Sequence, residues 1–294
     1  MVNNAVIRNP KNSMQVIGCK AGTEELVING CDVTSIAEEA FAGKKELRSV
    51  KIRAFRLREH KPRYIEAIGR AAFAGCSNLS HVELESDVAV LEERLFEGTT
   101  QRKVHIPESV ALVGKRAFAD CALLETVSGC EGLSVVQKEA FSGCASLKRI
   151  ELPAVRQIQD GAFAGCGALE SIRIGKDIKV LSDTFYGCPN LKRIHFEGSP
   201  EAWDALTGGT LASVPEDAMI YCEDNAGHPF HTQFFNEDLC YNAKDGRRVD
   251  KVNVYKGGAL EIPEGVVSTA PNFCAGREVL SVTFPDGFES LGYG

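Results

Sequence analysis

The chain has 294 residues, of which 44% are hydrophobic and 25% charged, and its formal net charge is −7. A mildly acidic chain argues against non-specific nucleic-acid binding, and no apolar run approaches the ~18 residues that would cross a bilayer. We therefore expect no nucleic-acid partner and no membrane insertion. The length alone suggests about two globular domains, unless the chain is a repeat array.

Residues 1–25 precede the first predicted strand, Leu26–Ile28, and we expect them to cap the N-terminal end of a core. The opening MVNNAVIRNPKNSMQVIGCK contains no apolar signal-peptide core. The protein therefore either stays in the cytoplasm or lacks its export signal in this sequence. Further along, the basic insertion FRLREHKPRY (55–64) is a candidate contact region, because irregular loops on rigid scaffolds often bind partners.

Seven segments share the consensus I-x-x-x-A-F-x-G-C-x-x-L-x-x-I-x-L, and they begin at Ile36, Ile68, Leu91, Val113, Val136, Ile158 and Val180. Their phenylalanines are Phe41, Phe73, Phe96, Phe118, Phe141, Phe163 and Phe185. After a first interval of 32 residues the steps are 22 or 23, and an eighth copy lies at Phe273. The period of about 22 residues predicts a solenoid.

The L-x-x-I-x-L end of the repeat alternates with period two, as in Leu147, Ile150 and Leu152, and predicts a short strand with one buried face. The A-F-x-G-C segment predicts a tight turn or a single helical turn, because Gly permits a sharp reversal and Phe fills the core. Fixing one repeat costs ~1–2 kcal/mol per residue in backbone entropy. The few apolar side chains of one repeat cannot offset that cost, so only stacked repeats are stable.

Residues 198–256 interrupt the repeat, and Asp245-Gly246 predicts a hairpin there. We predict an N-terminal cap (1–25), a first repeat block (26–222), an interruption with the hairpin (223–256) and the start of a second block (257–294). The last residues match the opening of another repeat, so we expect the natural protein to continue beyond residue 294.

These segments resemble the BspA-like leucine-rich repeats of bacterial surface proteins, with the Gly-Cys pair before the strand, as in Gly143-Cys144, and Trp203 in a closing segment. The resemblance covers residues 26–222 and 257–294. It implies an α/β solenoid in a right-handed superhelix, with short parallel strands on one face and turns or short helices on the other. It also implies adhesion to host, extracellular-matrix or cell-surface proteins, a secreted or surface location, and no shared catalytic residues.

Five of the eleven cysteines share one repeat position, which predicts structural packing rather than catalysis: Cys76, Cys121, Cys144, Cys166 and Cys188. Four possible zinc ligands cluster outside the repeats, namely Cys222, His228, His231 and Cys240. Their spacing matches no common structural zinc pattern, and unrelated side chains in a loop are the simpler interpretation. No catalytic motif is present. We therefore expect neither an enzyme nor a cofactor.

Stacked strands should direct two ladders of side chains outward, and we call these fourteen residues the strand face. The first ladder is Ser49, His81, Lys103, Thr126, Arg149, Ser171 and Arg193, and the second is Lys51, Glu83, His105, Ser128, Glu151, Arg173 and His195. Five Lys or Arg against two Glu give this face +3, so the remainder of the chain carries −10.

The proposed binding residues are therefore Lys51, His81, Lys103, His105, Arg149, Arg173, Arg193 and His195. An acidic protein patch or an acidic glycan would suit them, with affinity rising below about pH 6.5 as the histidines become charged. The alternative is a solvated face that only maintains solubility. Two functions stay open, an adhesin-like module that binds a protein or an anionic glycan, and an intracellular scaffold for protein–protein interaction.

Overall fold

The computed structural model describes residues 5–29, 33–54, 64–181, 184–207, 215, 218–222, 239–241, 248–252, 259–261, 268–269 and 281–291. The chain divides into two compact units. The first comprises residues 1–195 and 204–219, and the second comprises residues 196–203 and 220–294.

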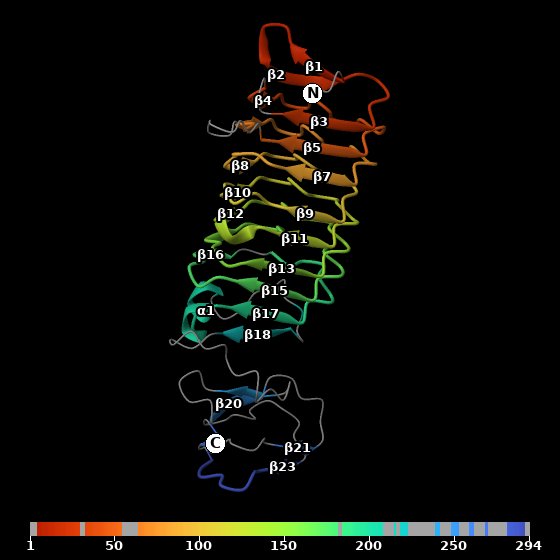
Figure 1. Cartoon of the computed structure of the whole chain (residues 1–294). Coiled ribbons are helices and arrows are strands. Elements are labelled where there is room, and N and C mark those ends of the chain that lie inside the picture. Colours follow the sequence, from red (N-terminus) through yellow and green to blue (C-terminus); the bar gives the residue numbers. More distant parts are fainter. Residues whose placement is uncertain are drawn as a thin grey trace. The chain divides into compact units, whose positions relative to one another are not determined.

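Each coil of the first unit contains one long strand, one two-residue strand and a turn around the repeat phenylalanine (Figure 1). The long strands are β3 (Glu25–Asn29), β5 (Ser49–Arg53), β7 (His81–Leu84), β9 (Lys103–His105), β11 (Thr126–Ser128), β13 (Arg149–Leu152), β15 (Ser171–Ile174) and β17 (Arg193–Phe196). They pair in the orders β3-β5-β7 and β9-β11-β13-β15-β17. The predicted period-two strands are therefore present and pair from coil to coil within each of these two groups.

A second series of strands runs through the isoleucine or valine that opens each repeat. These are β4 (Ser35–Ile36), β6 (Ala67–Ile68), β8 (Val90–Leu91), β10 (Leu112–Val113), β12 (Val135–Val136), β14 (Gln157–Ile158) and β16 (Val180–Leu181). At the N-terminal end, β1 (Val6–Asn9) and β2 (Asn12–Cys19) form an antiparallel hairpin, and β2 then pairs with β4 in parallel. The hairpin thus continues the short-strand sheet beyond the first repeat.

The turns at the phenylalanines form a third row of hydrogen bonds, which we call the turn ladder. In the fourth repeat the amides of Arg116, Phe118 and Asp120 donate to carbonyls of the next repeat, at 3.1, 2.8 and 2.7 Å. Arg116 and Asp120 have φ values of 54° and 59°, and in most repeats the second of these positions is glycine. Two left-handed residues four positions apart cannot belong to an α-helix, so the amides of this segment point to the neighbouring coil instead.

The architecture is therefore a parallel β-solenoid, and the expected α/β class is not confirmed. Among the described residues, only α1 (Pro200–Thr207) and a 3-10 turn, η1 (Cys130–Gly132), are helical. Of the two alternatives for the A-F-x-G-C segment, the tight turn is confirmed and the helical turn is wrong.

The core of the first unit is a column of phenylalanines with aliphatic side chains around it. All seven repeat phenylalanines are fully buried, and successive rings from Phe41 to Phe185 stack with centroids 5.0–6.1 Å apart. The repeat cysteines line the same core, and each thiol donates to the phenylalanine carbonyl of the preceding repeat, as in Cys144 Sγ to Phe118 O at 3.2 Å.

One charged network lies on the turns. The guanidinium of Arg116 donates to Glu97 (2.6 Å), Glu139 (2.9 Å) and Asp120 (2.8 Å). Burial alone would raise the pKa of the Glu97 carboxyl, but hydrogen bonds from Arg94 and Arg116 outweigh burial and hold that pKa below its ordinary value. The pKa of Arg116 is raised, mainly by its bonds to Glu97 and Glu139.

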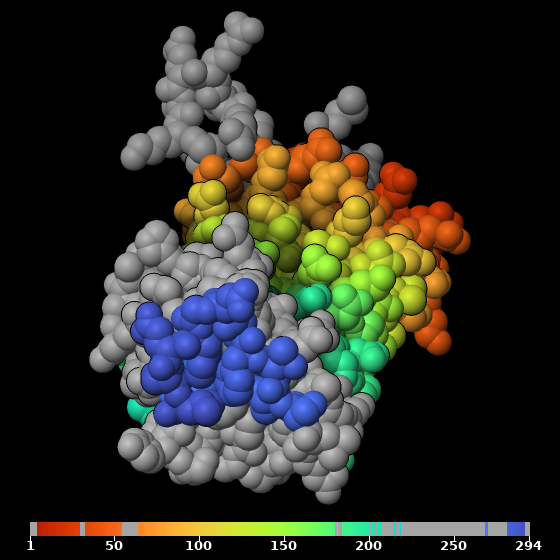
Figure 2. Space-filling model, turned by 90° about the horizontal axis from the view of Figure 1, so that it is seen from below, coloured from red at the N-terminus to blue at the C-terminus, as the bar shows by residue number. Residues whose placement is uncertain are grey.

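The described parts of the second unit are short strands and the start of α1. Trp203 of α1 is 5% exposed and packs against Phe196, with ring centroids 5.3 Å apart. Strands β19 (Leu239–Tyr241) and β20 (Arg248–Val252) pair antiparallel, while the expected turn residues Asp245 and Gly246 lie outside the described part. The other strands are β18 (Met219–Cys222), β21 (Ala259–Glu261), β22 (Ser268–Thr269) and β23 (Ser281–Thr283). Residues 281–291 form an exposed or half-buried surface segment (Figure 2), and Phe273 is not among the described residues.

Candidate binding surface

The two predicted ladders of the strand face are present. Thr126 pairs with Lys103 on one side and with Arg149 on the other, and Glu151 pairs with Arg173. The residues between them, such as Ile150 and Ile172, are buried, whereas the ladder residues are exposed or half-buried. The eight proposed binding residues therefore all lie on one outward surface of the long strands.

At the N-terminal end of the strand face, one carboxylate pairs with the neighbouring cations. Glu83 lies 3.4 Å from Lys51 Nζ, 3.6 Å from an Arg53 guanidinium nitrogen and 2.8 Å from His81 Nε2. The hydrogen bond from His81 is the largest contribution, and with Lys51 it lowers the pKa of Glu83 against the opposing effect of burial. Lys51 and His81 are thus engaged within the protein, together with Arg53, which the sequence analysis missed.

Further along the array, the strand face carries cations without such a partner. Lys103, Arg149 and Arg193 are exposed, and none of the three has an acidic group at ion-pair distance among the residues that the structure describes. His105 instead contacts a hydroxyl, with Nδ1 3.1 Å from Ser128 Oγ. The positive charge available to a partner therefore lies on β9 to β17.

His195 reports this positive charge. Its pKa is lowered below the ordinary value, first by burial and then by the neighbouring charges of Arg173 and Arg193, with Glu151 opposing them. His195 should therefore become charged only at a lower pH than an ordinary histidine, mainly because of burial and secondly because two guanidinium groups repel the added proton.

A second charged row lies beside the strand face, and we call it the rim. It consists of the residues immediately before the long strands β5 to β17: Arg48, Ser80, Arg102, Glu125, Lys148, Glu170 and Lys192. Four cations and two carboxylates give the rim a formal charge of +2. The rim can be recognised in the sequence, because both residues between the consensus Leu and Ile of each repeat are polar, as in Lys148 and Arg149. The two predicted ladders include only the second of these residues.

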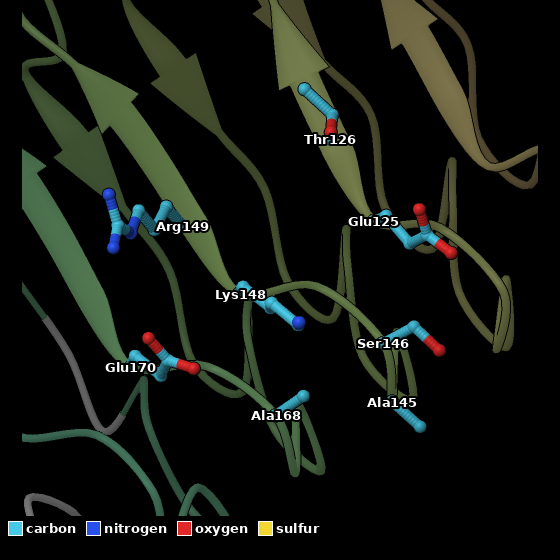
Figure 3. Close-up of a pocket in the computed structure, with 8 residues that line it drawn as sticks. All are labelled: Glu125, Thr126, Ala145, Ser146, Lys148, Arg149, Ala168 and Glu170. Carbon is cyan, nitrogen blue, oxygen red and sulfur yellow. The ribbon is translucent and has the colours of Figure 1, made fainter.

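The rim borders a shallow hollow of about 730 Å³ on the fourth to sixth repeats (Figure 3). Lys148 lies between Glu125 and Glu170, its equivalents in the adjacent coils, and Arg149 reaches the hollow from the strand face. Ala145 and Ala168 leave the space open because their side chains end at Cβ. A side chain of a partner that binds Arg149 would therefore find room beside it.

The repeat cysteines have no features of a nucleophile. Burial raises the pKa of the Cys76, Cys121 and Cys188 thiols to about 11, and it raises that of Cys144 further. A buried, protonated thiol bonded to a backbone carbonyl is a packing element. The prediction of structural cysteines is confirmed.

The zinc hypothesis stays untested. His228 and His231, and the side chains of Cys222 and Cys240, lie outside the described residues. Within the described part of the chain, no group of three or more His, Cys, Asp or Glu side chains could hold a metal ion. No helix in that part has the length and apolar character needed to cross a membrane.

Stacked coils of short parallel strands, built on a leucine- and phenylalanine-rich period, define a leucine-rich repeat protein. The sequence profile of the BspA type leucine-rich repeat region matches in six copies, over residues 60–166 and 112–203. Residues 60–203 of this chain are BspA-type leucine-rich repeats, as the resemblance implied. Leucine-rich repeat proteins are generally non-catalytic, and membership suggests a protein-interaction module.

Several solved structures are similar to this chain. A leucine-rich repeat protein from Bacteroides ovatus is 18% identical over 99% of this chain and 90% of its own, with a TM-score of 0.39. The T. pallidum leucine-rich repeat protein is 24% identical over 72% of this chain and 95% of its own (TM-score 0.43). A leucine-rich cell surface protein from Faecalibacterium prausnitzii is 18% identical over 69% of this chain and 96% of its own, with a TM-score of 0.33. These values carry no argument about function, and no curated protein matches the chain.

Proposed function

We propose that this chain is a non-catalytic, adhesin-like binding module that holds an acidic surface of a protein partner on its strand face. The observation that supports the proposal is the set of exposed cations that have no carboxylate at ion-pair distance among the described residues, Lys103, Arg149 and Arg193. Such cations attract an anionic partner, and no internal ion pair has to be broken before the partner binds.

A protein partner is favoured over a glycan. The strand face contains no aromatic side chain, so it lacks the flat surfaces on which sugar rings stack. Arginine suits carboxylates because its guanidinium binds both oxygens at once. The hollow beside Arg149 would admit one side chain of the partner.

Charge reversal tests the proposal. The triple variant Lys103→Glu, Arg149→Glu and Arg193→Glu should lose about tenfold or more in affinity for acidic peptides, because three favourable charge contacts become repulsive. The matched control reverses Lys138, Lys176 and Lys179, which are exposed and lie outside the strand face. An array of acidic peptides, sulfated glycans and sialylated glycans, read at two salt concentrations, compares the two variants.

Equal binding of both variants across the array would contradict the proposal. If the triple variant loses binding only to the glycans of the array, the partner would be an acidic glycan rather than a protein. Surface proteolysis of intact producing cells separates an adhesin from an intracellular scaffold, since only a surface protein would be removed.

A further inference from the structure

The joint between the second and third repeats lacks strand pairing in both sheets. The long strands β7 and β9 belong to different sheets, and so do the short strands β6 and β8. The structure describes residues 33–181 except 55–63. In this range, all remaining pairs of successive long strands and of successive short strands are hydrogen-bonded. The break therefore crosses the whole sheet structure at one place.

The sequence explains the break by a missing residue. In the third repeat Val104 follows Phe96 by eight residues, whereas the equivalent step is nine in the other repeats, as from Phe118 to Val127. The shortened segment places Gln101 where the other repeats have leucine. Gln101 is fully buried, and neither its amide nitrogen nor its amide oxygen has a hydrogen-bond partner.

Three further differences occur at the same joint. Thr99 replaces the repeat cysteine, and its hydroxyl donates to the carbonyl of Phe96 in its own repeat, so Phe73 receives no side-chain bond from the third repeat. Just past the end of β7, the buried Ser86 hydroxyl also has no partner. The inward-facing Val82 of β7 is only half-buried, whereas Val50 and Val104, its equivalents in β5 and β9, are buried.

The turn ladder remains closed across the joint. The amides of Ala71, Phe73 and Gly75 donate to carbonyls of the third repeat at 2.8, 3.0 and 2.7 Å. The rings of Phe73 and Phe96 are stacked with centroids 5.4 Å apart. The Thr100 amide also donates to the Leu79 carbonyl at 2.9 Å, the Asp87 amide donates to the Ile65 carbonyl at 3.4 Å, and Arg70 lies 3.8 Å from Glu93. The two repeats thus stay in contact through the turn ladder, the aromatic column and these isolated bonds, without a paired strand between them.

We infer that this joint is a break in cooperativity, at which the cap and the first two repeats open as one unit while repeats three to seven stay folded. In a repeat array, each interface contributes separately to the stability, so a weak interface uncouples the segments on its two sides. The neutralised part of the strand face lies on the segment that opens. The unpaired cations Lys103, Arg149 and Arg193 all lie on the other segment.

Thiol labelling of the full-length native protein tests the inference, because the repeat cysteines are buried on both sides of the joint. N-Ethylmaleimide labels a buried thiol only when the surrounding structure opens, and peptide mass spectrometry assigns each labelled site. We expect Cys76 to react at least tenfold faster than Cys121, with Cys121 and Cys144 reacting at similar slow rates. A smooth gradient of rates from Cys76 to Cys144, or equal rates at all sites, would overturn the inference.

A repaired joint provides the matched variant. Replacing Thr100–Lys103 with Ala-Leu-Leu-Glu-Thr, the sequence of residues 122–126, restores the nine-residue step and the core leucine. We expect Cys76 to become as slow as Cys121. Continued fast labelling of Cys76 would mean that it opens by fraying from the N-terminus, which contradicts the inference. If the graft does not fold, Gln101→Leu alone should still slow Cys76 severalfold, and an unchanged rate would count against it.

Discussion

Replacing Gln101 with leucine should stabilise the protein. The wild-type side chain buries an amide nitrogen and an amide oxygen without hydrogen-bond partners, and an unsatisfied buried polar group costs about 1–3 kcal/mol. Leucine removes both groups, and the array accepts leucine at this position in the other repeats, as at Leu124 and Leu147. Part of the gain is lost because the segment remains one residue short, so we expect an increase in the free energy of unfolding of about 1–3 kcal/mol.

Urea titration followed by far-UV circular dichroism measures this change, with the wild-type slope checked in each variant. The matched control is Leu124→Gln, which creates the same defect at the same register in the next repeat. It should destabilise by about 2–4 kcal/mol, because a buried leucine is lost and an unpaired amide is introduced. An unchanged or lower stability of Gln101→Leu would refute the reasoning, since it would mean that the amide is satisfied in solution, for example by a buried water.

Three other predictions concern the rest of the first unit. Gly175→Ala should cost about 1–3 kcal/mol in chemical denaturation, because the new Cβ would lie 1.8 Å from a backbone carbonyl oxygen of the preceding repeat, whereas Gly167→Ala, with nothing within 4 Å, should be neutral. Arg116→Met should cost about 1–3 kcal/mol at pH 7. The pKa of Glu97 is lower in the folded than in the unfolded protein, so its ion pair with Arg116 stabilises the fold above the unfolded-state pKa and ceases to do so as the pH falls through the folded-state pKa. Plots of the free energy of unfolding against pH for wild type and Arg116→Met should therefore converge at acidic pH. Parallel plots would show that the ion pair with Glu97 does not cause the difference. A proton NMR titration of His195 should give a pKa below 6.5, and a value at or above 6.5 would show that burial and the two neighbouring arginines do not together lower it.

The sequence predicted those parts of the fold that recur in every repeat. The phenylalanine column, the alternating strands and the buried cysteines each depend on one position that the period keeps in phase, so a single consensus locates them. The outward ladders followed from the same alternation, and Thr126 pairs with Lys103 and Arg149 as expected.

The features that the sequence analysis missed depend on differences between neighbouring repeats. The sequence of the turns does not distinguish a helical turn from the turn ladder. The left-handed position two residues before the phenylalanine is Glu, Ala or Arg in most repeats, and these residue types do not indicate a positive φ. The neutralisation of Lys51 by Glu83 required the side-chain conformations of adjacent coils. The burial of Gln101 could have been predicted from the spacing of eight rather than nine residues between Phe96 and Val104. The consensus does not show this difference, because aligning the third repeat with the others introduces a one-residue gap there.

The turn ladder also makes the two ends of the array chemically unequal. In the turn ladder of the first six repeats the donating amide hydrogens point toward the C-terminal end and the accepting carbonyl oxygens toward the N-terminal end, as in the bond from Phe41 N to Ala72 O. The peptide dipoles therefore add along the row, as they do in a helix, with the positive end after the last repeat. A structure that closes the beginning of the row must supply donors, and one that closes its end must supply acceptors, so the two ends of such an array cannot exchange their caps.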